Sequence, residues 1–381
     1  MSIKLSSNNV LNYIENFDWF YRQDLVSSIT IESHNTFLIK LQSAIKIIIK
    51  QERYYCDEDL HKNQSFFNEF RLYKALSNTL NLPIKNLYFD SQNSIISYQY
   101  PNNYTDLKTE SKNFKKILLF IPELIGCTLA KLHCRSSISQ TCHQVMNETS
   151  NGKLRYRFPY HIHLQHKIEP ETFFTIPPDS YKFIQFFQSD QILITSLQTV
   201  IYKIKNYCLT HNNLSFNNIL IPESYDNYQA KNQVKNPDLI KFINWENCCW
   251  GDPAFDLGSI ISGYLLLWLT SLIVHPEIKL ETSLQLALTP LEQIQPSIVA
   301  LTKAYLNTWN DILDHDPEFL TRVVQFSGLA LIYHIIEMIN SFKGFNNHSI
   351  CILIVAKNLL RQPEKYFNSV FGLTQTELLS N

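Results

Sequence analysis

The chain has 381 residues, of which 45% are hydrophobic and 18% are charged, and its formal net charge at pH 7 is −1. This length predicts two lobes or domains with separate hydrophobic cores. A net charge near zero gives no signal for nucleic acid or for an anionic membrane, so we expect neither as a partner. Only 8 residues are glycine, and no glycine-rich phosphate-binding motif occurs.

The cysteines and the most apolar segment both favour a cytoplasmic location. The 8 cysteines are scattered apart from the adjacent Cys248 and Cys249, in a chain whose core is large enough not to need disulfides. The first residues lack a charged end followed by an apolar core, so no secretion signal is expected. Residues 259–274 are too few to span a bilayer comfortably and include polar side chains, so they predict a buried core helix.

The first hundred residues predict a small sheet with one helix. Clustered β-branched residues between 28 and 53 indicate three short antiparallel strands. Helical spacing of apolar residues follows over 60–79. Two further runs that are typical of strands cover 84–89 and 94–100.

The rest of the chain predicts mainly helices around a short hairpin. A polar segment at 102–113 is expected to cross between lobes, and helical periodicity runs from 114 to 133. Prolines within 134–180 predict an irregular insertion near the substrate side. A helix is then predicted over 181–207, strands over 219–221 and 239–243, and helices after 255.

Two motifs carry most of the functional information. Residues 211–218 read His-Asn-Asn-Leu-Ser-Phe-Asn-Asn, and residues 243–257 contain Ile-Asn-Trp-Glu followed by Gly-Asp-Pro-Ala-Phe-Asp-Leu. Together they resemble the aminoglycoside phosphotransferase and choline kinase family, whose pattern is H-x-D-x-x-x-x-N followed by I-D-W-E and G-D-P-x-x-D-L. The resemblance covers most of residues 28–270. In it, Asn213 stands at the catalytic Asp position and Asn244 at the metal-binding Asp position.

This resemblance implies an α+β, two-lobed protein kinase-like fold, with a small β-rich N-lobe and a large, mainly helical C-lobe. Residues 1–100 would form the nucleotide-binding lobe. Residues 101–381 would form the lobe that carries the catalytic loop and the substrate site, with 134–180 as the irregular insertion.

Lys50 and Glu69 are the candidate nucleotide-binding residues. Lys50 ends a strand-like run at the position of the family's third-strand lysine, which reaches the phosphates, and Glu69 on the following helix would pair with it. Lys46 lies on the same strand face and is the competitor for this role. The alternative is that Lys50 and Glu69 are ordinary solvated residues.

The resemblance also assigns the loop residues. His211 and Asp256 would hold the catalytic loop in place, and Asn218 would supply an amide oxygen to a metal ion. Asp252 is a candidate helix N-cap. Glu246 is the nearest acid to the degenerate Asn244 and a weaker candidate metal ligand, since Mg²⁺ demands near-ideal octahedral placement.

The two amides predict impaired catalysis. Removing a general base at 213 typically lowers a rate by about 10²- to 10⁴-fold, and an amide at 244 loses the charge that holds Mg²⁺. We therefore predict a pseudokinase that binds nucleotide, with ATP as the candidate, or a small-molecule, peptide or protein partner, and no tightly held Mg²⁺. The alternatives are an active ATP-dependent kinase acting on a hydroxyl of a small molecule or of a peptide Ser or Thr, and a deliberately inactivated or nucleotide-independent form.

A cluster of histidines and cysteines between 133 and 166 raises the separate question of zinc. Its spacings match no zinc-ligand pattern, because no C-x₂-C unit occurs. A groove for substrate or partner is the better interpretation of the members, which are His133, Cys134, Cys142, His143, His161, His163 and His166.

Overall fold

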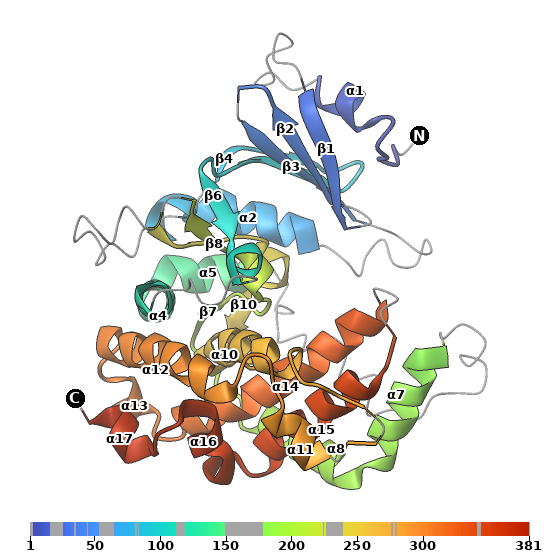
Figure 1. Ribbon diagram of the computed structural model, residues 1–381. Helices are drawn as coiled ribbons and strands as arrows, with labels where there is room; N and C mark the ends of the chain where they lie inside the picture. The colour runs from blue at the N-terminus through green and yellow to red at the C-terminus, as the bar shows by residue number, and fades with distance from the viewer. Residues whose placement is uncertain are drawn as a thin grey trace.

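In the computed structural model the chain forms a small lobe built on a sheet and a larger helical lobe (Figure 1). The structure describes residues 3–15, 26–33, 36–43, 45–52, 65–80, 82, 84–111, 119–148, 178–223, 225, 239–275, 277–278, 280–340 and 344–380. The fold class is α+β, as the resemblance implies.

The small lobe contains a five-stranded antiparallel sheet in the order β1-β2-β3-β5-β4. The predicted strands are all present, each within a few residues of its expected bounds. They are β1 (Val26–Ser33), β2 (Thr36–Leu41), β3 (Lys46–Gln51), β4 (Lys85–Asp90) and β5 (Ile95–Tyr100).

The central strand β3 has two different faces, because side chains alternate along a strand. Ile47 and Ile49 point to the outer face, where they pack in one cluster with Val10 and Ile14 of helix α1 (Val10–Ile14). The inner face carries Lys50, which lies between Thr36 of β2 and Ile96 of β5 in the strand register and faces helix α2. The alternation therefore places one lysine inside the lobe.

Helix α2 (Ser65–Leu80) packs against the inner face of this sheet. Its buried side is formed by Leu72, Tyr73 and Leu76, at the spacing that aligns residues on one face of a helix. Glu69 falls on the same face and is also fully buried. An acid at a position otherwise reserved for apolar residues requires a buried partner.

The connection between the lobes contains β6 (Tyr104–Asp106) and α3 (Leu107–Ser111). β6 pairs with β8 (Ile219–Pro222), which also pairs with β9 (Lys241–Phe242). The predicted hairpin of the large lobe is therefore present, and the inter-lobe segment adds a third strand to it.

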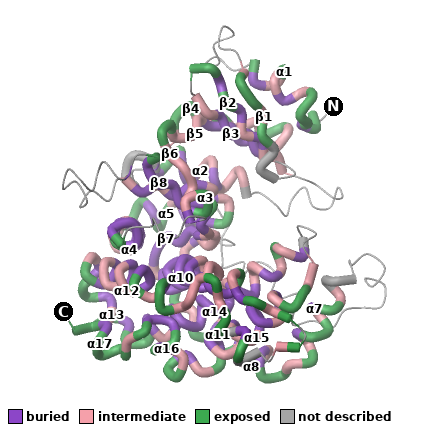
Figure 2. Tube along the Cα trace, in the orientation of Figure 1, coloured by how far each residue is buried: buried purple, intermediate pink, exposed green. Residues whose placement is uncertain are grey.

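The helices of the large lobe surround α10 (Pro253–Leu269), which is buried along nearly its whole length (Figure 2). Gly258 permits close contact with α14 (Phe319–Asn340), because a Cβ there would lie 2.8 Å from the Val323 carbonyl oxygen. The other helices are α4 (Phe120–Ser137), α5 (Gln140–Glu148), α7 (Pro178–Ser189), α8 (Gln191–Tyr202), α11 (Leu280–Gln285), α12 (Leu291–Thr308), α13 (Ile312–His315), α14 (Phe319–Asn340), α15 (Asn347–Arg361), α16 (Pro363–Phe371) and α17 (Gln375–Leu379).

Two predicted segments differ from the structure. The part of 134–180 that the structure describes is helical rather than irregular, because α4 continues to Ser137 and α5 follows; residues 149–177 lie outside the described residues. The single helix predicted over 181–207 is two helices, α7 and α8, since the Asp190 side chain caps the start of α8 by accepting a hydrogen bond from Leu193 N.

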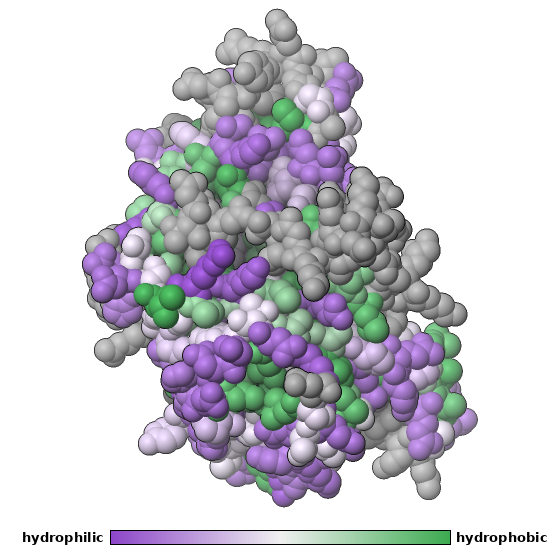
Figure 3. All heavy atoms as spheres, turned by 90° about the vertical axis from the view of Figure 1, so that its left-hand side faces the viewer, coloured by the Kyte–Doolittle hydropathy of each residue, from purple (hydrophilic) through white to green (hydrophobic). Residues whose placement is uncertain are grey.

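The predicted core helix at 259–274 falls on α10, which ends at Leu269. Among the described residues, one helix is long and apolar enough to cross a membrane, Phe319–Ile339, and 72% of its apolar window is buried inside the protein. On the face of the molecule shown in Figure 3, hydrophilic residues surround smaller hydrophobic areas.

Candidate functional site

A buried ion pair joins the sheet of the small lobe to α2. The Lys50 ammonium lies 3.1 and 2.9 Å from the two carboxylate oxygens of Glu69. Lys50 is 2% exposed and Glu69 is 0% exposed, so neither is the solvated surface residue of the alternative interpretation. The predicted proximity of the two residues is confirmed, while their role in binding a nucleotide stays a prediction.

The same lysine also contacts the large lobe. Glu246, on the 3₁₀ helix η6 (Trp245–Asn247), places a carboxylate oxygen 3.1 Å from the Lys50 ammonium. The backbone N–H of Trp245 donates to Glu69 over 3.2 Å. One cation and two acids therefore connect the lobes.

Lys46, the competitor, has a different position. Its ammonium donates to the Tyr104 carbonyl oxygen and to a Glu223 carboxylate oxygen, each at 3.3 Å. Both partners lie at the connection between the lobes. Lys46 therefore supports the inter-lobe connection, whereas Lys50 lies inside.

The pKa values in this cluster follow from burial and charge. Burial opposes the charged form of Lys50, but Glu246 and Glu69 outweigh it and raise the pKa of Lys50 above its ordinary value. Burial raises the pKa of Glu69 despite Lys50. Burial also acts against Glu246, yet the nearby Lys50 lowers its pKa. Glu246 is thus the acid that keeps its charge, and Glu69 is the one that gains a proton more easily.

The three asparagines of the motifs lie together, and Tyr98 links them to Glu69 of the buried ion pair. Asn244 Nδ2 donates to Asn218 Oδ1 over 2.6 Å, and Asn218 Nδ2 donates to the Asn213 backbone carbonyl over 2.7 Å. Asn218 belongs to the 3₁₀ helix η4 (Phe216–Asn218), and Asn244 precedes η6. The structure therefore brings Asn213, Asn218 and Asn244 together, as the sequence predicts.

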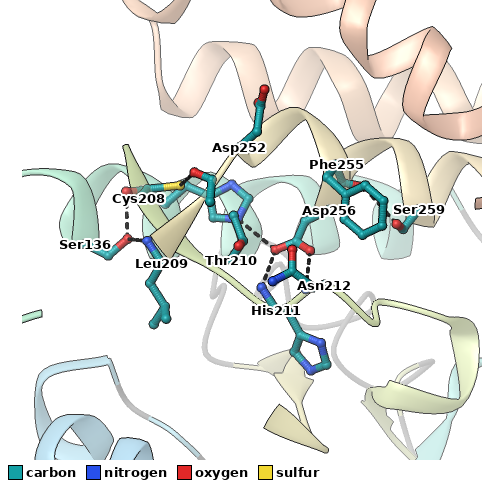
Figure 4. Close-up of polar contacts among 12 residues, drawn as sticks. Ser136, Cys208, Leu209, Thr210, His211, Asn212, Asp252, Phe255, Asp256 and Ser259 are labelled. Atoms are coloured by element: carbon teal, nitrogen blue, oxygen red, sulfur yellow. Dashed lines mark hydrogen bonds and ion pairs between the residues drawn. The ribbon is translucent and has the colours of Figure 1, made fainter. Parts of the chain in front are cut away.

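Asp256, near the start of α10, holds the loop that contains Asn213 (Figure 4). Its carboxylate accepts backbone hydrogen bonds from His211 N at 2.7 Å and Asn212 N at 2.8 Å. Asn212 has φ = 60°, in the left-handed region that Asn tolerates better than most residues. The loop-holding position that the resemblance gives to Asp256 agrees with this geometry.

His211 connects this loop to the next one. Its Nε2 lies 2.8 Å from the Ile243 carbonyl oxygen, which can only accept, so Nε2 carries the proton. Nδ1 then accepts from Asn213 N at 3.3 Å. Burial lowers the pKa of His211 below its ordinary value, in keeping with a neutral ring.

His133 and Tyr98 are two site residues that sequence reasoning missed. His133 Nε2 lies 3.1 Å from Asp256, and its Nδ1 lies 2.9 Å from the Tyr305 hydroxyl. The Leu-Ala-Lys-Leu-His run at 129–133 is the local sequence signal for His133, although its neighbours between 133 and 166 favour the interpretation as a groove. The Tyr98 hydroxyl lies 3.4 Å from Asn244 Oδ1 and 3.5 Å from Glu69 Oε1, contacts that no local spacing predicts.

The described residues do not fit a tightly held divalent cation. The side-chain amides of Asn218 and Asn244 are hydrogen-bonded to each other, and Glu246 forms an ion pair with Lys50. In the described part of the chain, no group of three or more His, Cys, Asp and Glu residues is arranged to hold a metal. His161, His163 and His166 of the possible zinc cluster lie outside the described residues.

By sequence, the chain matches no protein-family model and no curated protein. By structure, it is similar to a choline/ethanolamine kinase family protein from Mesorhizobium loti, with a TM-score of 0.50, 11% identity, and 96% of this chain and 99% of that chain covered. It is also similar to the amicoumacin kinase hAmiN in complex with AMP-PNP, Ca²⁺ and Ami, with a TM-score of 0.53, 11% identity and 93% of both chains covered. Wild-type aminoglycoside 2'-phosphotransferase-IIIa, solved with GDP, gives 0.49 at 12% identity, covering 93% of this chain and 98% of that one. The first two likenesses show that the chain has the kinase-like fold of those proteins.

Proposed function

We propose that this protein is a catalytically impaired, kinase-like protein of the cytoplasm that acts by binding a nucleotide, a partner, or both in the cleft around Lys50. The observation that carries the proposal is the contrast within one site. The Lys50–Glu69 ion pair, which positions phosphates in kinases, is intact, whereas neutral amides stand at 213 and 244. The cysteines in the described part of the chain are all free thiols, which supports the cytoplasmic location.

The charges of the cleft define how a nucleotide would bind. Two carboxylates surround Lys50, so phosphate groups would have to displace at least one of them to reach the ammonium. Glu246 is the candidate for displacement, because its side chain is 22% exposed while that of Glu69 is 0% exposed. We therefore expect weaker binding than in a cleft where Lys50 has a single acidic partner.

A thermal-unfolding assay with ATP tests this proposal. A ligand that binds only the folded state at 100 times its Kd stabilises it by about 2.7 kcal/mol. We expect saturating ATP to raise the Tm of the wild-type protein equally with and without Mg²⁺. In Lys50→Met, the Tm should be the same with ATP as without it. The absence of a shift with ATP, ADP or GTP would leave partner binding without a nucleotide as the function.

The second candidate function is an active ATP-dependent kinase that phosphorylates a hydroxyl of a small molecule or of a peptide Ser or Thr. It is favoured by Asp256, which holds the loop at 211–213 in a defined geometry. Positioning alone supplies part of the rate of a phosphoryl transfer. Nucleotide turnover by the wild-type protein would establish this candidate and contradict the first.

Restoring both acids separates impaired chemistry from a lost pocket. We expect Asn213→Asp with Asn244→Asp to give slow, Mg²⁺-dependent ATP turnover, since each carboxylate has nearly the shape of the amide it replaces. Asn244→Asp alone should restore metal-assisted binding without turnover. A folded double variant that binds no nucleotide would show that the cleft no longer accepts one.

A further inference from the structure

A series of hydrogen bonds runs from Tyr98 through Asn244 and Asn218 to the backbone of Asn213. The Tyr98 hydroxyl donates to Asn244 Oδ1 over 3.4 Å, and Asn244 Nδ2 donates to Asn218 Oδ1 over 2.6 Å. Asn218 Nδ2 in turn donates to the Asn213 carbonyl over 2.7 Å. The series begins on β5 of the small lobe and ends in the loop at 211–213. It therefore connects three segments that are far apart in the sequence.

The Asn213 carbonyl, the last acceptor of the series, determines which atom donates in the hydrogen bond between Asn218 and Asn244. A backbone carbonyl can only accept, so the Asn218 atom that faces Asn213 must be its NH₂ group. The other atom of that amide, facing residue 244, must then be the carbonyl oxygen. Residue 244 is thereby required to donate, which an amide does and a carboxylate cannot.

The backbone does not explain the choice of residue at 244. Asn244 has φ = 66° and ψ = 62°, a left-handed conformation. Asn and Asp are both enriched in that region, so either residue satisfies the backbone. The difference between them is the N–H donor, because an Asp carboxylate would face the Asn218 oxygen with no proton between the two atoms.

We propose that the amide of Asn244 takes the place of a divalent cation as the link between the loops at 218 and 244, so that these loops are held together without a metal. A cation would join two oxygen ligands by its charge, and here an N–H group joins one oxygen to the residue at 244. Asn244 is accordingly a working part of a metal-independent site. The proposal rests on the proposed function only in its consequence that a nucleotide binds there equally well without a metal.

Thermal unfolding with the metal alone tests this proposal. In EDTA we expect the Tm of Asn244→Asp to fall by roughly 1–4 °C, because a buried acceptor loses its donor and meets a negative charge. Millimolar MgCl₂ or CaCl₂ should return most of that loss by joining the two oxygens. The wild-type Tm should be the same in EDTA and in either salt.

Two control variants separate the donor from the added charge. Asn217→Asp adds the same charge to an exposed neighbour of Asn218, and we expect its Tm to stay near the wild-type value in all three conditions. Asn244→Gly keeps the left-handed backbone but has neither amide nor carboxylate. It should lose stability in EDTA and recover nothing with the cation.

Three outcomes overturn the proposal. The first is a wild-type Tm that rises in MgCl₂ or CaCl₂ as much as that of Asn244→Asp. The second is an Asn244→Asp protein as stable as wild type in EDTA, and the third is one that MgCl₂ and CaCl₂ leave unrescued. If Asn244→Asp does not fold in any condition, titration of the wild-type protein with CaCl₂ by calorimetry decides, and bound Ca²⁺ refutes the proposal while its absence supports it. None of these experiments contains a nucleotide, so a failure of nucleotide binding is a separate result.

Discussion

Two clusters of charged side chains, one between the two lobes around Lys50 and one in the core of the large lobe, differ in their ratio of cations to acids. In the cleft, Lys50 has two acidic partners, Glu69 and Glu246. In the large lobe, two cations meet two acids, and Arg322 is completely buried among them. In the balanced cluster the positive and negative charges are equal in number. The cluster around Lys50 has one more acid than cations, and the side chain of Glu246 is partly exposed.

The balanced cluster ties three elements of the large lobe together. Arg322 of α14 donates to Asp252 over 2.8 Å and to Asp316 over 2.9 Å. Lys205 donates to Asp316 from its ammonium over 2.7 Å and to Asp252 from its backbone N–H over 3.0 Å. Asp252 also caps α10 by accepting from Ala254 N. This cluster pairs each of its charges with a charge of opposite sign, whereas the cluster around Lys50 has one carboxylate in excess.

We expect the largest loss of stability from removing the buried arginine of the balanced cluster. Arg322→Met leaves Asp252 and Asp316 without their shared partner, and breaking a buried pair from one side costs about 3–5 kcal/mol. We expect the free energy of unfolding to fall by the upper part of that range in urea titrations. Lys203→Met is the matched control, because its pair with Glu318 is 40% and 56% exposed and such pairs contribute about 0–1 kcal/mol. Equal losses in the two variants would refute the distinction.

Removing the cation of the cleft should have a smaller effect that depends on pH. In Lys50→Met the carboxylates of Glu69 and Glu246 lose the charge that favours their ionised form. The pKa of Glu69, already raised by burial, therefore rises further, and that of Glu246 rises above its value in the unfolded chain. The folded state then binds more protons than the unfolded state above pH about 4.5, and stability falls as the pH increases. We expect a loss of about 3 kcal/mol at pH 8 and clearly less at pH 5. Denaturant titrations at both pH values measure this difference, and a loss independent of pH would contradict it.

The pH dependence of the large-lobe cluster should run in the opposite direction for one acid. Burial disfavours the charged form of Asp316, but hydrogen bonds from Arg322 and Lys205 lower its pKa below the ordinary 3.8. Its contribution to stability is therefore complete above that value and is lost as the pH falls through the lower folded-state pKa. Asp316→Asn should cost about 1–3 kcal/mol at pH 7 and make unfolding between pH 4 and pH 2 less steep. An unchanged acid transition would show that Asp316 does not contribute.

The sequence predicts the local features of both clusters and misses the long-range ones. Asp252 is recognisable as an N-cap because it directly precedes Pro253 and an apolar helix. Glu69 is predicted through the family resemblance, because its place on the helix alone is equally compatible with a solvated carboxylate. The contacts of Glu246 with Lys50 and of Arg322 with Asp252 depend on how distant segments pack, and no spacing within one element encodes them. The resemblance to a family locates the loops. The hydrogen-bond partners of their amides depend on how these loops pack against each other, which the sequence does not show.

The smallest expected effect concerns Lys46, whose side chain is more exposed than that of Lys50 and less exposed than that of Lys203. Its ion pair with Glu223 has exposures of 21% and 52%, so the pair alone should contribute less than about 1 kcal/mol. Lys46 also donates to the Tyr104 carbonyl and lies 5.8 Å from the centre of the Tyr100 ring, contacts that salt screens less. We therefore expect Lys46→Met to lose slightly more stability than Lys203→Met in low salt. The difference should persist in 1 M NaCl, where the contribution of the exposed Lys203 pair disappears. If both losses vanish together in high salt, Lys46 acts only through its ion pair and gives the inter-lobe connection no further support.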